Sequence, residues 1–155
     1  MKKIVAIVGH KHTKKDWIAS KLAENSDVQN IRPYVGLELP KGVEPDEFGD
    51  YHIVLPQVHY DMLNTEDVLY NVEINGRNYT YFRFQMTAPY NVLITDDYGV
   101  MALKDKWDGE LYTIFVTSKN QKPSKRVGEY LTPSEFDEVF DVDTGDIDEL
   151  EARIV

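Results

Sequence analysis

The amino-acid sequence predicts an α/β protein in which a parallel sheet carries helices on both faces and an antiparallel hairpin is inserted. Three observations predict this class. An apolar run at residues 4–8 leads through a glycine-containing loop into a helical pattern, short apolar runs recur at 91–95 and 111–116, and two strand-like runs meet at Asn75-Gly76. Short apolar runs of this kind are typical of strands buried on both faces of a parallel sheet.

The expected elements follow from the spacing of apolar residues and from turn and cap signals. They are a strand at 3–8, a helix at 16–24, a strand at 50–54, a short helix around Val58 and Met62, a hairpin at 67–84, strands at 91–95 and 111–116 with a helix between them, a helix from Thr132, a strand at 138–142 and a last helix after Asp146. Asn75-Gly76 tolerates the positive φ that a two-residue hairpin turn needs. Capping boxes are expected at Thr132-Pro133-Ser134-Glu135 and at Asp146 with Glu149. Residues 36–49 and 117–131 are expected to be irregular.

Length and composition limit the class of protein. The chain has 155 residues, 42% of them hydrophobic, which suits one domain spanning 1–155. It has no cysteine, so disulfides and thiolate zinc sites are excluded. The apolar run after Lys3 is too short for a signal peptide, and no window approaches a membrane span. We therefore expect a cytoplasmic protein with no membrane partner.

Charge is distributed unevenly along the chain. The net charge of −10 argues against nucleic acid as the partner. Residues 1–15 nevertheless hold five lysines and no acid, whereas residues 135–151 are rich in Asp and Glu. A basic pocket on an acidic body suits a small anionic ligand, and an ordinary solvated distribution of charge remains the alternative.

The loop after the first strand, Gly9 to Asp16, has the layout of a phosphate-binding loop. The full pattern is G-x-x-x-x-G-K-[ST], in which backbone N–H groups and the lysine hold phosphates and the hydroxyl holds Mg²⁺. Gly9 and Lys15 fit the spacing, whereas Lys14 replaces the second glycine and Asp16 replaces the hydroxyl residue. We expect Gly9, Thr13, Lys14, Lys15 and Asp16 to bind the cofactor. Asp16 has two interpretations, a helix cap, which we place first, and a Mg²⁺ ligand.

Further motifs follow this loop in a fixed order. They are Asn30-Ile31-Arg32-Pro33-Tyr34-Val35, Asp50-Tyr51-His52-Ile53-Val54, Val68-Leu69-Tyr70, Gly76-Arg77-Asn78-Tyr79-Thr80-Tyr81, Val92-Leu93-Ile94-Thr95-Asp96-Asp97-Tyr98-Gly99, Ile114-Phe115-Val116 and Phe136 to Val142. In this order and spacing the chain resembles the guanylate kinase family of P-loop nucleoside monophosphate kinases over nearly its whole length. The resemblance implies a P-loop kinase-like parallel sheet, an NMP-binding-like insertion at 31–84 and a shortened lid-like segment at 117–131.

The resemblance also implies roles for individual residues. Lys15, Asp96 and Arg126 would be catalytic, with ATP and Mg²⁺ as cofactors and a nucleoside monophosphate as acceptor. The implied acceptor-binding residues are Arg32, Tyr51, Tyr70, Tyr79 and Asp96. Among the cations of the lid-like segment, Arg126 is preferred because a guanidinium can grip two phosphate oxygens. Asp97 is a second candidate should the register shift by one residue.

Departures from the family pattern leave two functions open. Val35 stands where the family has a second phosphate-clamping arginine, Tyr70 where it has the glutamate that reads the base, and Tyr81 where it has a small hydroxyl residue. One interpretation is a kinase that transfers the ATP γ-phosphoryl group to an acceptor other than, or besides, GMP. The other is a catalytically inactive relative that uses the fold to bind a protein partner.

Overall fold

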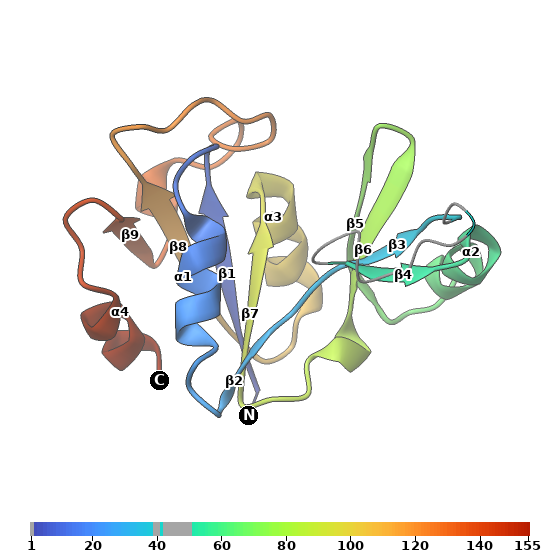
Figure 1. Cartoon of the computed structure of the whole chain (residues 1–155). Coiled ribbons are helices and arrows are strands. Elements are labelled where there is room, and N and C mark those ends of the chain that lie inside the picture. Colours follow the sequence, from blue (N-terminus) through green and yellow to red (C-terminus); the bar gives the residue numbers. More distant parts are fainter. Residues whose placement is uncertain (1, 39–40, 42–50) are drawn as a thin grey trace. The chain divides into compact units, whose positions relative to one another are not determined.

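The computed structural model describes residues 2–38, 41 and 51–155, and the chain divides into two compact units. The first comprises Met1–Asn30 and Thr87–Val155, and the second comprises Ile31–Met86. Each unit has its own sheet (Figure 1). The expected mixture of strands and helices, with an inserted antiparallel hairpin, is confirmed.

The first unit is built on a parallel five-stranded sheet. Its strands are β1 (Lys3–Gly9), β2 (Val28–Asn30), β7 (Tyr90–Thr95), β8 (Glu110–Thr117) and β9 (Glu138–Asp141), in the spatial order β2-β7-β1-β8-β9. All four neighbouring pairs are parallel. The central strand β1 pairs Val8 with Thr95 on one side and Gly9 with Val116 on the other, so the ends of β1, β7 and β8 lie at one edge of the sheet.

Helices cover both faces of this sheet (Figure 1). They are α1 (Lys15–Leu22), α3 (Asp97–Lys106) and α4 (Ile147–Ile154). The core on the α1 and α4 side includes Val5, Ile7, Leu22 and Leu150, and every residue of the run 4–8 in β1 is fully buried. An unbroken apolar run is therefore explained by burial on both faces.

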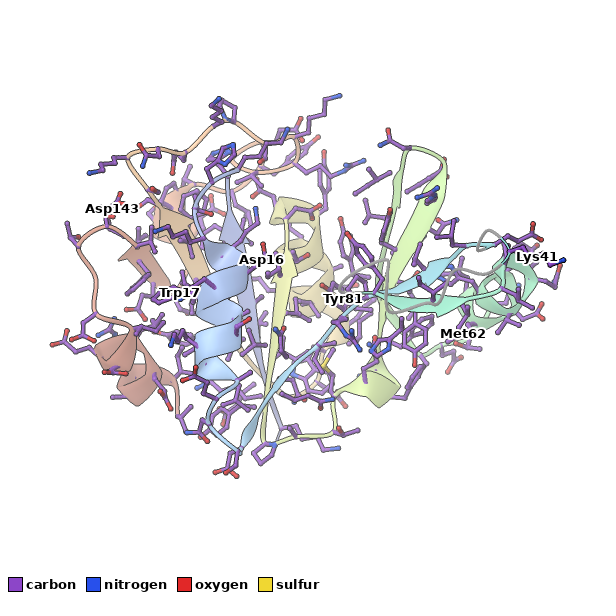
Figure 2. All side chains as sticks on the ribbon, viewed as in Figure 1. Asp16, Trp17, Lys41, Met62, Tyr81 and Asp143 are labelled. Carbon is purple, nitrogen blue, oxygen red and sulfur yellow. The ribbon has the colours of Figure 1, made fainter. Side chains whose placement is uncertain are left out.

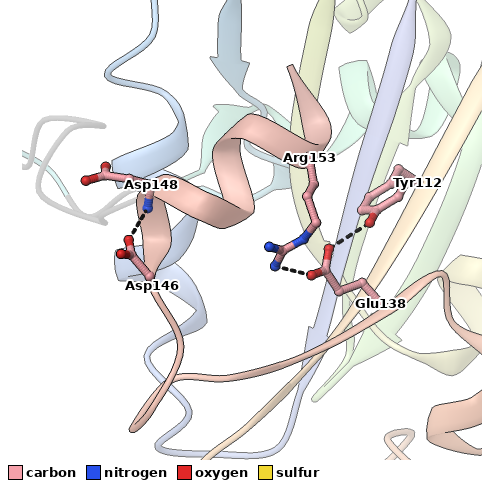
Figure 3. A network of polar contacts seen from close by, with 5 residues as sticks. All are labelled: Tyr112, Glu138, Asp146, Asp148 and Arg153. Atoms are coloured by element: carbon pink, nitrogen blue, oxygen red, sulfur yellow. Dashed lines mark hydrogen bonds and ion pairs between the residues drawn. The ribbon is translucent and has the colours of Figure 1, made fainter.

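A polar network fastens α4 to the sheet (Figure 3). The Glu138 carboxylate pairs with the Arg153 guanidinium and accepts a 2.7 Å hydrogen bond from the Tyr112 hydroxyl. At the other end of the helix, Asp146 caps the first turn by accepting from the backbone N–H of Asp148 at 2.9 Å. The helix predicted after Asp146 is thus confirmed, with Asp146 as its cap.

The Tyr112 hydroxyl should make stability depend on alkaline pH. Burial and the hydrogen bond to Glu138 raise the pKa of Tyr112 to about 12, from 10.0. The neutral phenol is therefore favoured by folding, so this contribution is complete below pH 10 and is lost as the pH rises toward 12. Because the side chain is only partly buried, we expect a loss of about 1 kcal/mol. The unfolding free energies of wild type and Tyr112→Phe would be measured in urea from pH 10 to pH 12. The difference between the two proteins should vanish at the alkaline end, and a constant difference would contradict this linkage.

The second unit contains a four-stranded sheet and one helix. Its elements are β3 (Tyr34–Gly36), β4 (His52–Val54), α2 (Pro56–Leu63), β5 (Val68–Ile74) and β6 (Arg77–Phe82), with strand order β4-β3-β6-β5. Strands β5 and β6 form the predicted hairpin, and both turn residues have positive φ, 53° at Asn75 and 78° at Gly76. This is the backbone that an Asn-Gly turn favours. On one face of the sheet, His59 of α2 is buried and its Nε2 lies 2.8 Å from the Thr80 hydroxyl.

Some element predictions were wrong or incomplete. Strands β2 and β3 were not predicted, because three residues are too few for a periodic signal. The capping box at Thr132 exists but starts only a 3-10 turn, Pro133–Glu135, since extended backbone follows at Phe136. Most of the predicted irregular segment 36–49, together with Asp50, lies outside the described residues.

Candidate phosphate-binding site

The loop that follows β1 lies at the carboxyl edge of the five-stranded sheet (Figure 1). Strand β1 is central. The chain runs from β1 to β2 on one side of it, and later crosses from β7 to β8 on the other side. In open parallel sheets, ligands bind outside the carboxyl ends of the strands where the strand order reverses in this way. The topology therefore places Gly9 to Asp16 where a ligand is expected.

The backbone of this loop is shaped to present N–H groups. His12 and Lys14 both have left-handed backbone, with φ of 66° and 58°. Left-handed residues in a turn can point neighbouring N–H groups into one concavity, which favours anions. Lys14 is also the N-cap residue of α1, and no side chain caps the first turn of this helix. The N–H groups at the start of α1 therefore add partial positive charge beside the loop.

The structure corrects the first interpretation of Asp16. Asp16 lies in the first turn of α1, two residues after the N-cap position, and makes no capping hydrogen bond. Figure 2 labels Asp16 and Trp17 on opposite sides of this helix. The Asp16 side chain is exposed. The capping role is therefore wrong, whereas a carboxylate at the mouth of the loop remains compatible with metal ligation.

Lys15 folds back over the loop. Its Nζ donates to the backbone carbonyl of Gly9 at 2.8 Å and lies 3.4 Å from that of His10. Burial lowers the pKa of Lys15, the charge of Lys11 lowers it further, and Asp16 partly compensates. A partly desolvated ammonium that donates to two carbonyl groups is poised to exchange these contacts for a phosphate oxygen, which is a stronger partner.

Thr13 and Gly9 determine the shape of the loop. Thr13 is buried, and its hydroxyl donates to the His10 carbonyl at 2.9 Å, so it contacts the loop itself. A Cβ atom added to Gly9 would lie 2.7 Å from the Thr13 hydroxyl oxygen and 3.1 Å from the carbonyl oxygen of Val116. Only glycine fits between these two groups without a shift of the loop or of β8.

Gly9→Ala should therefore displace the loop. We expect a loss of about 1–3 kcal/mol in unfolding free energy, typical of an overpacked site, together with weaker phosphate binding. Gly76→Ala is the matched control, because nothing lies within 4 Å of its added Cβ and only the positive φ is strained. Chemical unfolding and titration with inorganic tripolyphosphate would measure both effects. Equal anion affinity in Gly9→Ala and wild type would show that the close approach at Gly9 does not shape the site.

Two aspartates follow β7 and have different surroundings. Asp96 caps α3, and its Oδ1 accepts from the Gly99 N–H at 2.9 Å. Asp97 is fully buried, and its carboxylate accepts from the N–H groups of Gly128 at 3.2 Å, Tyr130 at 2.9 Å and Leu131 at 3.1 Å. Asp97 therefore holds the end of the segment predicted to be lid-like.

The segment at 117–131 is hydrogen-bonded directly to the phosphate-binding loop. Lys11 and Lys122 exchange two backbone hydrogen bonds, at 2.9 and 3.0 Å. His10 Nδ1 accepts from the backbone N–H of Ser124 at 3.0 Å. Arg126 has left-handed backbone, with φ of 67°, and its carbonyl accepts from the N–H of Asp97 at 2.9 Å. These bonds were not predictable from the sequence, because the contact between His10 and Ser124 spans 114 positions.

Of the predicted acceptor residues, Asp96 lies in the first unit and the other four lie in the second, where the three tyrosines share one face. The rings of Tyr51 and Tyr79 are 5.3 Å apart. Tyr79 and Tyr81 are two residues apart on β6, so their side chains lie on the same face of the sheet. Tyr81 pairs with Tyr70 on β5, which places Tyr70 on this face as well. Arg32 lies near His52 instead, where its charge adds to the effect of burial in lowering the pKa of that imidazole.

In residues 2–38, 41 and 51–155, no three His, Cys, Asp or Glu side chains converge in a way that could hold a metal ion by themselves. Over the same part of the chain, no helix combines the length and apolar character needed to cross a bilayer.

Comparison with known proteins supports the fold. The chain is similar to the crystal structure of guanylate kinase from Anaplasma phagocytophilum, with a TM-score of 0.64 and 18% sequence identity over 99% of this chain and 82% of that one. No protein-family model matches the sequence, and no curated protein matches it. At this identity the likeness shows a guanylate kinase-like fold, as the sequence motifs predicted.

Proposed function

We propose that this protein binds ATP through the loop Gly9 to Asp16 and transfers the γ-phosphoryl group to a nucleoside monophosphate. The observation that carries this proposal is the position of Lys15, a partly buried ammonium that donates to the carbonyl groups of Gly9 and His10 at the carboxyl edge of the sheet. Phosphoryl transfer depends mainly on positioning and on positive charge around the moving group, and this loop supplies both.

The residues near the loop also suit Mg²⁺. This ion is usually held by one or two carboxylates together with phosphate oxygens and waters. Asp16 is exposed in the first turn of α1, and its charge acts on Lys15. Asp96 follows β7, where the buried Thr95 hydroxyl has no hydrogen-bond partner among the described residues. Asp16 and Asp96 would hold the ion, which would neutralise charge on the phosphates.

The acceptor would be bound by the second unit. Tyr51, Tyr70 and Tyr79 offer aromatic surface and hydroxyl groups, and Arg32 offers a guanidinium, which together suit a nucleoside monophosphate. A tyrosine stands at position 70, where the resemblance would place a base-reading glutamate. We therefore propose an acceptor other than, or in addition to, GMP.

One observation favours a second function, a catalytically inactive protein-binding module. Val35 occupies the position of the second phosphate-clamping arginine, and it is buried, with 2% of its surface exposed. A buried valine cannot substitute for a cation at this position, so the acceptor phosphate would lose one of its contacts. Arg32 and the tyrosines would then be available for a phosphorylated or acidic peptide.

The two functions are separated by nucleotide binding and turnover. Calorimetric titration of ATP, with and without Mg²⁺, would be combined with ADP production against a panel of ribo- and deoxynucleoside monophosphates. Turnover with one acceptor, lost in Lys15→Ala, is the expected result. Failure to bind ATP at about millimolar concentration, the upper end of ordinary KM values, would overturn the enzyme proposal in favour of a protein partner.

A further inference from the structure

Two lysines face each other where the segment 117–131 meets the phosphate-binding loop. Lys11 and Lys122 form an antiparallel bridge in which each backbone N–H donates to the other residue's carbonyl. Side chains directly opposite in such a pair leave on the same face, with Cβ atoms about 5 Å apart. Like charges on directly opposite residues destabilise such a pair.

Nothing in the described part of the chain neutralises this pair. Both side chains are exposed, and neither forms an ion pair with a described residue. The charge of Lys11 also reaches Lys15, where it opposes protonation of the ammonium group inside the loop. Three lysines from two segments therefore concentrate positive charge at one edge of the sheet.

Other contacts prevent the two segments from moving apart. The bond from the Ser124 N–H to His10 Nδ1 lies two residues beyond the bridge. Further along, the Asp97 carboxylate holds the backbone from Gly128 to Leu131. In Figure 1 the segment after β8 arches over the end of β1. The backbone contacts thus hold the two lysines opposite each other, where an anion could bind between their side chains.

We propose that Lys11 and Lys122 form a fixed cationic clamp that binds the outer phosphates of a polyphosphate held in the loop. This inference rests on the proposed function for the position of the phosphate chain. The backbone bridge holds Lys122 beside the loop before any ligand binds. A preformed clamp binds without the cost of ordering a mobile segment.

Inorganic tripolyphosphate is the probe that tests the clamp, because it carries the anion without a base. We expect Lys122→Ala to weaken its binding by about tenfold, the effect of one charged hydrogen bond, as measured by calorimetry at low and at high ionic strength. Lys119→Ala is the matched control, since it removes an exposed lysine of the same segment that lies outside the bridge. Its affinity should stay within about twofold of wild type, as expected for an exposed, screened charge outside the bridge.

Lys11→Glu distinguishes the clamp from a purely structural role of the bridge. A carboxylate opposite Lys122 replaces repulsion with attraction, so the melting temperature of the ligand-free protein should rise while tripolyphosphate binding is lost. A lower melting temperature, or unchanged binding in both Lys122→Ala and Lys11→Glu, would overturn the clamp, as would a wild-type protein that does not bind tripolyphosphate.

The same titrations separate this inference from the proposed function. Tripolyphosphate binding that depends on Lys11 and Lys122, without binding of ATP, would support the clamp and contradict the proposed kinase. Binding of ATP that requires Lys15 but is indifferent to Lys11 and Lys122 would support nucleotide binding and overturn the clamp.

Discussion

Lys15→Met should weaken ATP binding by about 10- to 100-fold, because a charged hydrogen bond to phosphate contributes about 1.5–3 kcal/mol. The wild-type ammonium lies 2.8 Å from the Gly9 carbonyl and is partly desolvated. It therefore loses little solvation when it turns to a phosphate oxygen. A methionine keeps most of the side-chain volume and removes the charge. If the proposed kinase activity is present, the rate of transfer should fall further, by about 10²–10³-fold.

Stability measurements make this result interpretable. Removing the ammonium costs two contacts to carbonyl groups but also removes a buried charge, so the unfolding free energy should change by no more than about 1 kcal/mol. Lys21→Met on the same helix is the control, because the Lys21 side chain is partly exposed and its ammonium contacts Glu24 and the Trp17 ring. Equal ATP affinity in Lys15→Met and Lys21→Met would show that the loop does not bind phosphate through Lys15.

Much of the fold was predictable because its strands carry strong local signals. The run at 4–8 is wholly apolar and the turn at Asn75-Gly76 requires positive φ, so both are readable without tertiary context. The strand Tyr34–Gly36 was not predicted, since it is short and exists through its pairing with residues 52–54 and 79–80. Elements defined mainly by their neighbours leave little trace in the sequence.

The same distinction applies to the candidate site. The place of Lys15 after a buried strand follows from local spacing, and the structure puts it inside the loop. Asp16 was first interpreted as a helix cap, but the cap position is taken by Lys14 in a left-handed conformation, which the sequence does not display. The contacts of His10, Lys11 and Asp97 with residues 122–131 connect distant parts of the chain, so no spacing rule could reveal them.

Asp97→Ala should cause the largest loss of stability among these variants, about 3–5 kcal/mol. The Asp97 side chain is fully buried, and its removal leaves the N–H groups of Gly128, Tyr130 and Leu131 without their acceptor. Each unsatisfied buried donor costs about 1–3 kcal/mol. These losses overlap because the three donors share one carboxylate, so they do not add fully.

Asp97→Asn separates the hydrogen bonds from the overall fold. Its amide oxygen can replace the Oδ2 atom that serves Tyr130 and Leu131, whereas the bond from Gly128 is lost, so an intermediate loss of stability is expected. Asp105→Ala is the control on the same helix, because it removes an exposed carboxylate and should change stability by less than about 0.5 kcal/mol. Urea unfolding gives the free energies, and amide hydrogen exchange should show faster exchange at residues 122–131 in Asp97→Asn than in wild type. If both Asp97 variants matched Asp105→Ala in stability and exchange, Asp97 could not be the residue that fastens this segment to the sheet.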